Sequence, residues 1–79
     1  MLGSGTKPDL RSLAIESLQA SPIFHGRLAL GAIRVDSDGA TLVLSGSLPS
    51  FYLKQLLQET LKRLTGVVSV QNRVIVDDK

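Results

Sequence analysis

Few side chains in this sequence could carry out catalysis or bind a metal. The 79 residues include one histidine, His25, and no cysteine. Thiolate sites and two-histidine metal sites are therefore excluded, and a catalytic triad has no evident set of partners for His25. We expect His25 to be a loop residue. The sequence predicts a protein that is not an enzyme, with no catalytic residue, no metal ligand and no cofactor.

Two pairs of aspartates are the only other candidates for site chemistry. Asp36 and Asp38 precede Gly39 as in the beginning of a calcium-binding loop, but Ala40 occupies the next alternate position and no glutamate follows at the required distance. This spacing is typical of a turn. Asp77 and Asp78 are expected to be solvated charges, because a catalytic pair of carboxylates needs a cleft that a chain of this size is not expected to form.

The composition indicates one small globular domain. Apolar residues make up 43% of the chain and charged residues 20%, and nine cations against seven anions give a net charge of +2. This balance is too even to indicate nucleic-acid binding. The chain also lacks a Gly-x-x-Gly loop and has only two Phe and one Tyr, so we expect no nucleic-acid partner. No signal peptide or transmembrane segment is expected either.

The first half of the chain predicts an arm, a helix and a strand. Residues 1–8 are rich in glycine and small polar side chains and are expected to be a disordered arm. Apolar residues at helical spacing predict a helix over residues 9–20, with Asp9 at its positive end. The apolar run of residues 28–35 predicts a strand. The apolar residues of the helix are Leu10, Leu13, Ala14, Ile15 and Leu18.

The second half predicts a hairpin, a second helix and a last strand. Residues 36–39 form the expected turn, and residues 40–45 the next strand, which ends at Gly46. Ser50 is the expected cap of the second helix, and Gly66 lies where a left-handed conformation would end it. From Val68 onward the apolar period changes to two, as in a half-buried strand. The apolar face of this helix contains Leu53, Leu56, Leu57, Leu61 and Leu64.

These elements predict an α+β fold in the order αββαβ, with residues 9–77 as the single domain. Two helices on one face of a three-stranded sheet would bury both apolar helix faces in a two-layer sandwich. Two strand orders are compatible with this pattern. In the order that we favour, the first strand is central and every pairing is antiparallel; in the other, the second and third strands pair in parallel through a right-handed crossover.

The alternation along the strands also predicts which side chains remain on the uncovered face of the sheet. Four of them, Arg34, Val43, Arg73 and Ile75, form a candidate surface for a partner protein or a second copy. Phe51 is expected to pack against the domain, as is Tyr52, and the alternative is that the two residues anchor it to a membrane. The residues expected to face the helices are Ile33, Val35, Leu42, Leu44, Val68, Val70, Val74 and Val76, and the others expected on the open face are Leu30, Ala32, Val67 and Gln71.

Several short motifs resemble the BON domain, a family named for bacterial osmotically induced and nodulation proteins. The family pattern is a hairpin that ends in Leu-Ser-Gly, a Pro-Ser entry into a helix, and then Gly-Val, a spaced Val, an Asn and a final Val. In this chain, Asp38-Gly39 lies about one residue further from Gly46 than is usual in the family, which indicates a longer turn or a bulge. The matching residues are Leu44, Ser45, Gly46, Leu48, Pro49, Ser50, Gly66, Val67, Val70, Asn72 and Val76.

The resemblance implies a non-enzymatic binding module of the bacterial envelope or stress response. Such a module would attach to a phospholipid surface or to an envelope partner protein, and Lys54, Lys62 and Arg63 are the candidate lipid-facing residues. The alternative is a structural assembly domain that self-associates through its open sheet face without a lipid role. We expect a monomer or a weak homo-oligomer. An envelope location would follow if the chain is an excised domain.

Overall fold

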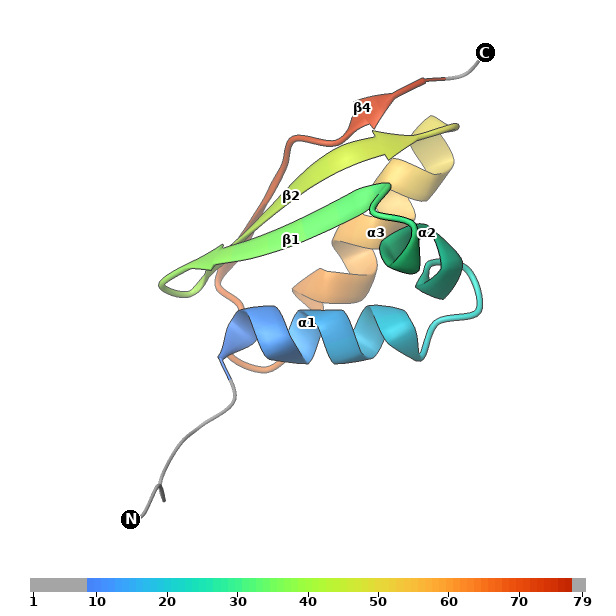
Figure 1. Ribbon diagram of the computed structural model, residues 1–79. Helices are drawn as coiled ribbons and strands as arrows, with labels where there is room; N and C mark the ends of the chain where they lie inside the picture. The colour runs from blue at the N-terminus through green and yellow to red at the C-terminus, as the bar shows by residue number, and fades with distance from the viewer. Residues whose placement is uncertain (1–8, 78–79) are drawn as a thin grey trace.

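The protein is a small α+β fold, described here for residues 9–77 in a computed structural model (Figure 1). Three helices and a mixed four-stranded sheet make up this part of the chain. The predicted arm at residues 1–8 and the aspartate at position 78 lie outside the described residues. In chain order, the elements are α1 (Leu10–Gln19), α2 (His25–Ala29), β1 (Ile33–Asp38), β2 (Thr41–Leu48), α3 (Phe51–Lys62), β3 (Ser69–Asn72) and β4 (Ile75–Val76).

Helix α1 begins where the sequence predicted. Asp9 is its N-cap, and one carboxylate oxygen of Asp9 accepts a 2.8 Å hydrogen bond from the amide of Ser12. This bond occupies one of the amides that have no partner within the first turn. Ala14 and Leu18, four residues apart on one side of α1, are fully buried. The capped, amphipathic helix of the sequence analysis is confirmed.

Helix α2 was not predicted, and it replaces the beginning of the expected strand. Residues 25–29 are helical and β1 begins only at Ile33. Phe24 is 1% exposed and Leu28, four residues later, packs against the same core. A helical turn brings these two side chains onto one face, whereas an extended chain would separate them. His25 is therefore the first residue of α2 rather than a loop residue.

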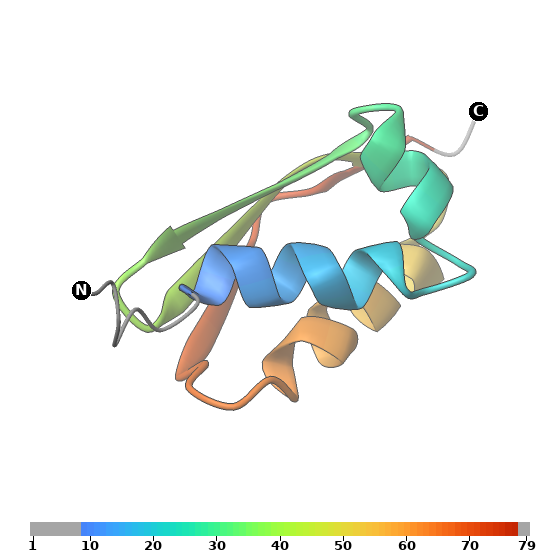
Figure 2. The ribbon, with the colours of Figure 1, turned by 60° about the horizontal axis from the view of Figure 1, so that its bottom comes forward.

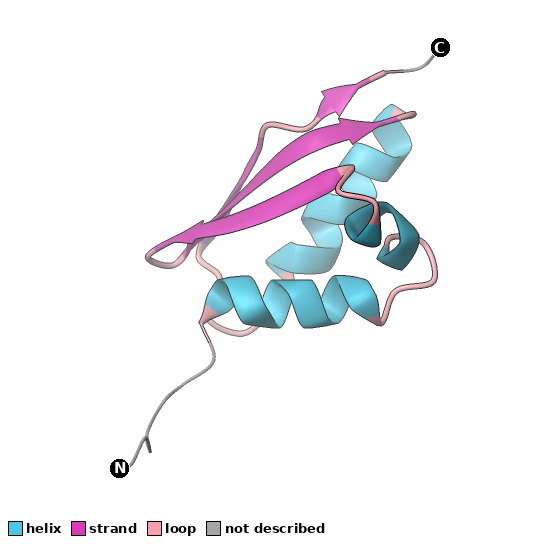
Figure 3. Ribbon diagram, in the orientation of Figure 1, coloured by secondary structure: helices cyan, strands magenta, loops and turns pink. Residues whose placement is uncertain are grey.

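Strand β2 is the centre of the sheet, so the favoured strand order was wrong. β1 pairs with β2 in antiparallel fashion, while β3 and β4 both pair with β2 in parallel (Figure 3). β2 is the longest strand, and Leu42, Leu44 and Leu48 on it are at most 1% exposed. A central strand gains this burial because it has a neighbour on both sides. The parallel alternative considered from the sequence is the observed pairing.

The hairpin between β1 and β2 turns later than expected. Residues 36–38 belong to β1, and Asp38 pairs with Thr41, so the turn consists of Gly39 and Ala40. Gly39 has a φ of 62°, a conformation that glycine adopts without steric cost. β2 also continues through Gly46 instead of ending there.

The last predicted strand is divided into β3 and β4. The amide of Arg73 donates to the carbonyl of Leu44 at 2.9 Å, as expected for the parallel pairing of Leu44 with Asn72. The register is the same on both sides of the interruption, since Leu44 aligns with Asn72 and Ser47 with Ile75, so no residue is inserted there. The Asn72 side-chain oxygen accepts from the amide of Val74 at 3.2 Å and stabilises this interruption.

The turn before β3 reverses two predicted side-chain positions. Val68 is 77% exposed rather than covered by the helices, and Val67 packs against the core rather than on the open face. Gly66 has the predicted positive φ, 95°. Helix α3 has already ended at Lys62, so Gly66 lies in the turn that follows the helix. In this turn the amide of Val67 donates to the carbonyl of Leu64. The left-handed glycine is confirmed, but it does not cap α3.

Helices α1 and α3 pack on the same side of the sheet, as Figure 2 shows. α3 begins at the predicted cap, where the Ser50 hydroxyl accepts from the amide of Leu53 at 3.1 Å. The other side of the sheet is not covered by either helix. The core between the helices and the sheet consists of Ala14, Leu18, Phe24, Ile33, Val35, Leu42, Leu44, Leu48, Leu57, Leu61 and Val74.

Candidate functional site

The three cations predicted to face lipid are spread along α3 and its C-cap. Lys54 is half-buried in the first turns, whereas Lys62 and Arg63 are exposed at the other end. Lys54 and Lys62 are separated by about 12 Å along the helix axis, and Lys54 and Arg63 point in about opposite directions around it. The structure does not bring these three residues together in one basic face.

The first turn of α3 instead exposes two aromatic rings. Phe51 is 68% exposed and Tyr52 71% exposed, so the prediction that they pack against the domain was wrong. The ammonium group of Lys54 lies 5.7 Å from the centre of the Phe51 ring, within the range of a cation–π interaction. The spacing of the apolar face could have revealed this exposure, because Leu53, Leu57 and later leucines define a face that excludes both aromatic positions.

A shallow groove lies on each side of this turn. One has a volume of about 310 Å³ and is lined by Tyr52, Gln55, Leu56 and Glu59. The other, of about 320 Å³, runs between α3 and β3 and includes Phe51, Lys54 and Asn72. Both grooves are open surface features, with the carboxylate of Glu59 as their acidic group. They are suited to surface contact rather than to enclosing a small substrate.

The four residues predicted to form a partner surface do lie on the open face of the sheet. Arg34 and Arg73 are exposed, Ile75 is 67% exposed and Val43 is half-buried. Leu30, which was expected on the same face, lies at the end of α2 and not on a strand. The rest of the face between β1 and β3 is polar. It contains the hydroxyls of Thr41, Ser45, Ser47 and Ser69 and the side-chain amide of Gln71.

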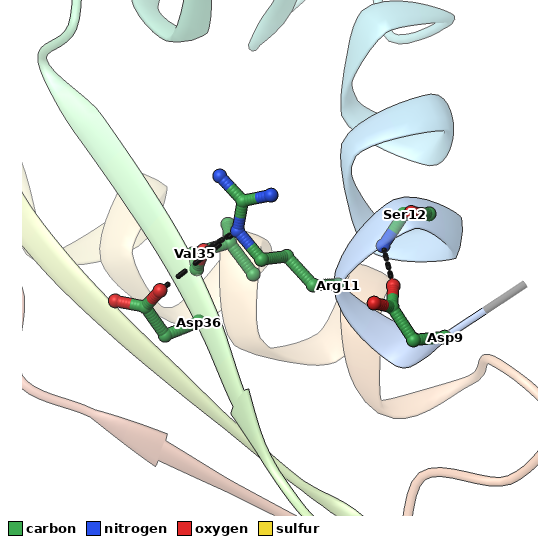
Figure 4. Close-up of polar contacts among 5 residues, drawn as sticks. All are labelled: Asp9, Arg11, Ser12, Val35 and Asp36. Carbon is green, nitrogen blue, oxygen red and sulfur yellow. Dashed lines mark hydrogen bonds and ion pairs between the residues drawn. The ribbon is translucent and has the colours of Figure 1, made fainter.

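The free edge of β1 is covered by an arginine from α1, as Figure 4 shows. The Nε of Arg11 donates to the carbonyl of Val35 at 3.0 Å and lies 3.8 Å from a carboxylate oxygen of Asp36. A bond to an outward-pointing carbonyl removes one site at which another strand could pair. The same contact directs Asp36 toward the edge of the sheet and away from its centre.

The titratable side chains of residues 9–77 are dispersed over the surface. No group of three or more His, Asp or Glu side chains in this part of the chain could hold a metal ion. The Nδ1 of His25 lies 3.0 Å from the carbonyl of Ser21 on an exposed surface. The hydrogen bond from the Ser12 amide lowers the pKa of the Asp9 carboxyl group.

Comparison of the sequence with models of protein families and with curated proteins gave no match. Among the helices of residues 9–77, none has the length and apolar character that crossing a bilayer requires.

Proposed function

We propose that this protein is a non-enzymatic binding module that attaches to an anionic phospholipid surface through the first turn of α3. The supporting observation is the exposure of Phe51 and Tyr52 beside the ammonium group of Lys54. Aromatic rings partition into the headgroup region of a bilayer, and a neighbouring cation is attracted to anionic lipids. The apolar and the electrostatic contributions arise from one turn of helix.

The arrangement of elements also supports a BON-like assignment. If β3 and β4 are taken as one strand interrupted at Arg73, and α2 as an additional turn, the order becomes αββαβ in two layers, as the resemblance implies. Asn72, one of the motif residues, lies between β3 and α3 and donates to the carbonyl of Lys54. The motif residues therefore contribute to the packing of α3, which carries the proposed membrane contact.

Self-association through the open sheet face has less support. Val43 and Ile75 are the only large apolar residues of that face among the strand residues, and hydroxyl, amide and guanidinium groups surround them. Stable homodimer interfaces usually have a more apolar centre than this.

The proposal is tested by co-sedimentation of the protein with vesicles of phosphatidylcholine alone and with vesicles containing phosphatidylglycerol. A single cation near the surface contributes about 1 kcal/mol, so we expect weak binding to the anionic vesicles that decreases with salt, and no detectable binding to the neutral ones. Replacing Phe51 and Tyr52 together by serine should reduce binding to anionic vesicles by about tenfold or more, because most of the inserted apolar area is then lost.

Val68→Ser is the matched control, since Val68 is 77% exposed and lies beyond the other end of α3. This variant loses exposed apolar area without affecting the proposed contact and should bind like the wild type. Equal loss in the control and in the Phe51/Tyr52 variant, or unchanged binding in both, would contradict the proposed location. Salt-resistant binding to neutral vesicles would show that charge has no part in it.

A further inference from the structure

We propose a second binding site at the centre of the open sheet face, where Arg34, Ser45 and Arg73 form a receptor for a dianionic phosphate group, as in a phosphate monoester. This site is separate from the first turn of α3, and the proposal does not depend on the membrane contact. It rests on the register of three neighbouring strands and on the distribution of charge around them.

The strand register places the two arginines on either side of Ser45. Arg34 on β1 is paired directly with Ser45 on β2. On the other side of β2, the amide of Arg73 donates to the carbonyl of Leu44 at 2.9 Å, which places Arg73 beside the same part of the strand. The two arginine Cα atoms are therefore about two strand spacings, or about 10 Å, apart. Each guanidinium group can reach a ligand placed above Ser45.

All three side chains are on the open face of the sheet. Arg34 lies between the buried residues Ile33 and Val35, so alternation directs it away from the helices. Ser45 follows the buried Leu44 and is directed the same way. Arg73 lies between Asn72, whose side chain donates to α3, and the buried Val74.

Asp36 has the carboxylate nearest to Arg34 and Arg73 in the strand register, and it does not neutralise them. Neither Arg34 nor Arg73 forms an ion pair with a carboxylate of residues 9–77, and Asp36 makes its contact with Arg11 at the edge of β1. The Arg73 guanidinium has one long contact, 3.4 Å, to the side-chain oxygen of Gln71. This contact is to a neutral amide two residues earlier in the chain, so it leaves the charge of Arg73 available for an anion.

The hydroxyl of Ser45 is also available. Two rows away on the same face, the hydroxyls of Thr41 and Ser69 are hydrogen-bonded to each other at 2.8 Å. Ser45 has no such partner among the described side chains, and it is only half-buried. Its hydroxyl can donate to a phosphate oxygen between the two guanidinium groups, each of which offers two parallel donors to an oxyanion.

The number of charges selects the class of phosphate. A phosphate monoester carries close to two negative charges at neutral pH, which match the two guanidinium charges. A phosphodiester, such as the linkage in most phospholipid headgroups, carries one. We therefore expect the site to prefer a monoester, whether this is a soluble metabolite or a monoester lipid headgroup.

The experiment is a titration of ¹⁵N-labelled protein with glycerol 3-phosphate, followed by amide and arginine Nε–Hε chemical shifts. We expect saturable shifts centred on Arg34, Ser45 and Arg73, with a dissociation constant on the order of 1 mM, as for few contacts on an exposed surface. Arg34→Ala and Arg73→Ala should each weaken binding by about tenfold or more. Arg→Lys at either position should restore only part of it, because lysine lacks the planar pair of donors.

Arg63→Ala is the matched control: it removes an exposed arginine from the end of α3 and should leave the titration unchanged. Dimethyl phosphate, titrated in parallel, should bind at least several-fold more weakly, and equal binding would contradict the preference for a monoester. Glycerol 3-phosphate and vesicles containing phosphatidic acid distinguish a soluble source from a membrane source. Linear shifts without saturation, or saturable shifts that persist in both alanine variants, would overturn the site, and neither outcome bears on the membrane contact of α3.

Discussion

The side-chain amide of Asn72 donates a 2.9 Å hydrogen bond to the main-chain carbonyl of Lys54, and so links the end of β3 to the first turns of α3. The same side chain accepts from the amide of Val74 through its oxygen. One residue thus stabilises both the interruption between β3 and β4 and the position of the helix that presents Phe51. Its two bonds use the donor and the acceptor of an asparagine together.

Substitution of Asn72 should therefore destabilise the fold more than its partial exposure suggests. We expect Asn72→Ala to lower the free energy of unfolding by about 1–3 kcal/mol, as for the loss of two partly buried hydrogen bonds. Asn72→Asp keeps the acceptor for Val74 but places a carboxylate against the Lys54 carbonyl, so it should not restore stability. Urea denaturation followed by circular dichroism measures both. Gln71→Ala, at an exposed neighbouring position, is the control and should change stability by less than about 0.5 kcal/mol.

Leu57 should contribute strongly to the core. It is fully buried on the predicted face of α3, and large-to-small substitutions at such positions cost about 2–5 kcal/mol. We expect Leu57→Ala to lower the midpoint of urea denaturation by a corresponding amount, or to unfold so small a domain. Gln55→Ala, on the exposed side of the same helix, should have little effect. A loss below about 0.5 kcal/mol for Leu57→Ala would contradict the packing of α3 described above.

The sequence was sufficient to predict those elements whose signals are local. The Asp9 and Ser50 caps, the leucine face of α3 and the glycine hairpin depend on spacing within a few residues. The two caps, the leucine face and the turn at Gly39 are present in the structure. The α+β class followed from the same patterns.

Features that depend on distant contacts were mispredicted. The order of the strands depends on how much burial each strand gains from its two neighbours. The apolar run of residues 28–35 suggested that the first strand is central, but the central strand is β2. The burial of Phe24 required helix α2, which no local period of that segment indicates. The interruption between β3 and β4 lies where the Asn72 side chain accepts from the amide of Val74 and also contacts α3. It was therefore not visible from the alternation of side chains alone.

The candidate sites were predictable only in part. Alternation along the strands placed Arg34, Val43, Arg73 and Ile75 on one face, and the structure brings them together there. In the sequence, Lys54 forms a group with Lys62 and Arg63 only because all three belong to one predicted helix. Distance along the helix axis separates Lys54 from Lys62, and the angle around the axis separates Lys54 from Arg63. The exposed pair of Phe51 and Tyr52 was assigned to packing because aromatic residues are usually buried, although the leucine face of α3 excludes them.

The N-cap of α1 should make part of the stability depend on pH. The hydrogen bond from the Ser12 amide lowers the pKa of Asp9 below its ordinary value of 3.8. A carboxyl whose pKa is lower in the folded state stabilises the fold above its unfolded pKa. That contribution is lost as the pH falls through 3.8 toward the folded value. We expect the carboxyl shift of Asp9, followed by NMR, to titrate with a midpoint below 3.8.

Asp9→Asn provides the matched comparison, because asparagine also caps helices through its side-chain oxygen but does not titrate. The difference in stability between the wild type and this variant should therefore decrease when the pH is lowered from neutral to below 3.8. A constant difference over that range would show that the Asp9 charge does not stabilise α1.

Two glycines allow opposite effects of the same substitution to be compared. Gly46, within β2, has a φ of 114°, and a β-carbon there would overlap the main-chain carbonyl of Ala32. That carbonyl accepts the amide of Ser47 at 3.0 Å, so it cannot move away without breaking the β1–β2 pairing. Gly46→Ala should therefore cost more than the roughly 1–2 kcal/mol of left-handed backbone alone.

Gly26, within α2, has no positive φ and no atom within 4 Å of the position that a β-carbon would occupy. Gly26→Ala should consequently stabilise the protein by about 0.4–1 kcal/mol, through higher helix propensity and a less flexible unfolded chain. Thermal denaturation of the two variants beside the wild type measures both effects. Stabilisation by Gly46→Ala would contradict the close approach of β2 to Ala32, and destabilisation by Gly26→Ala would contradict the helical conformation of residues 25–29.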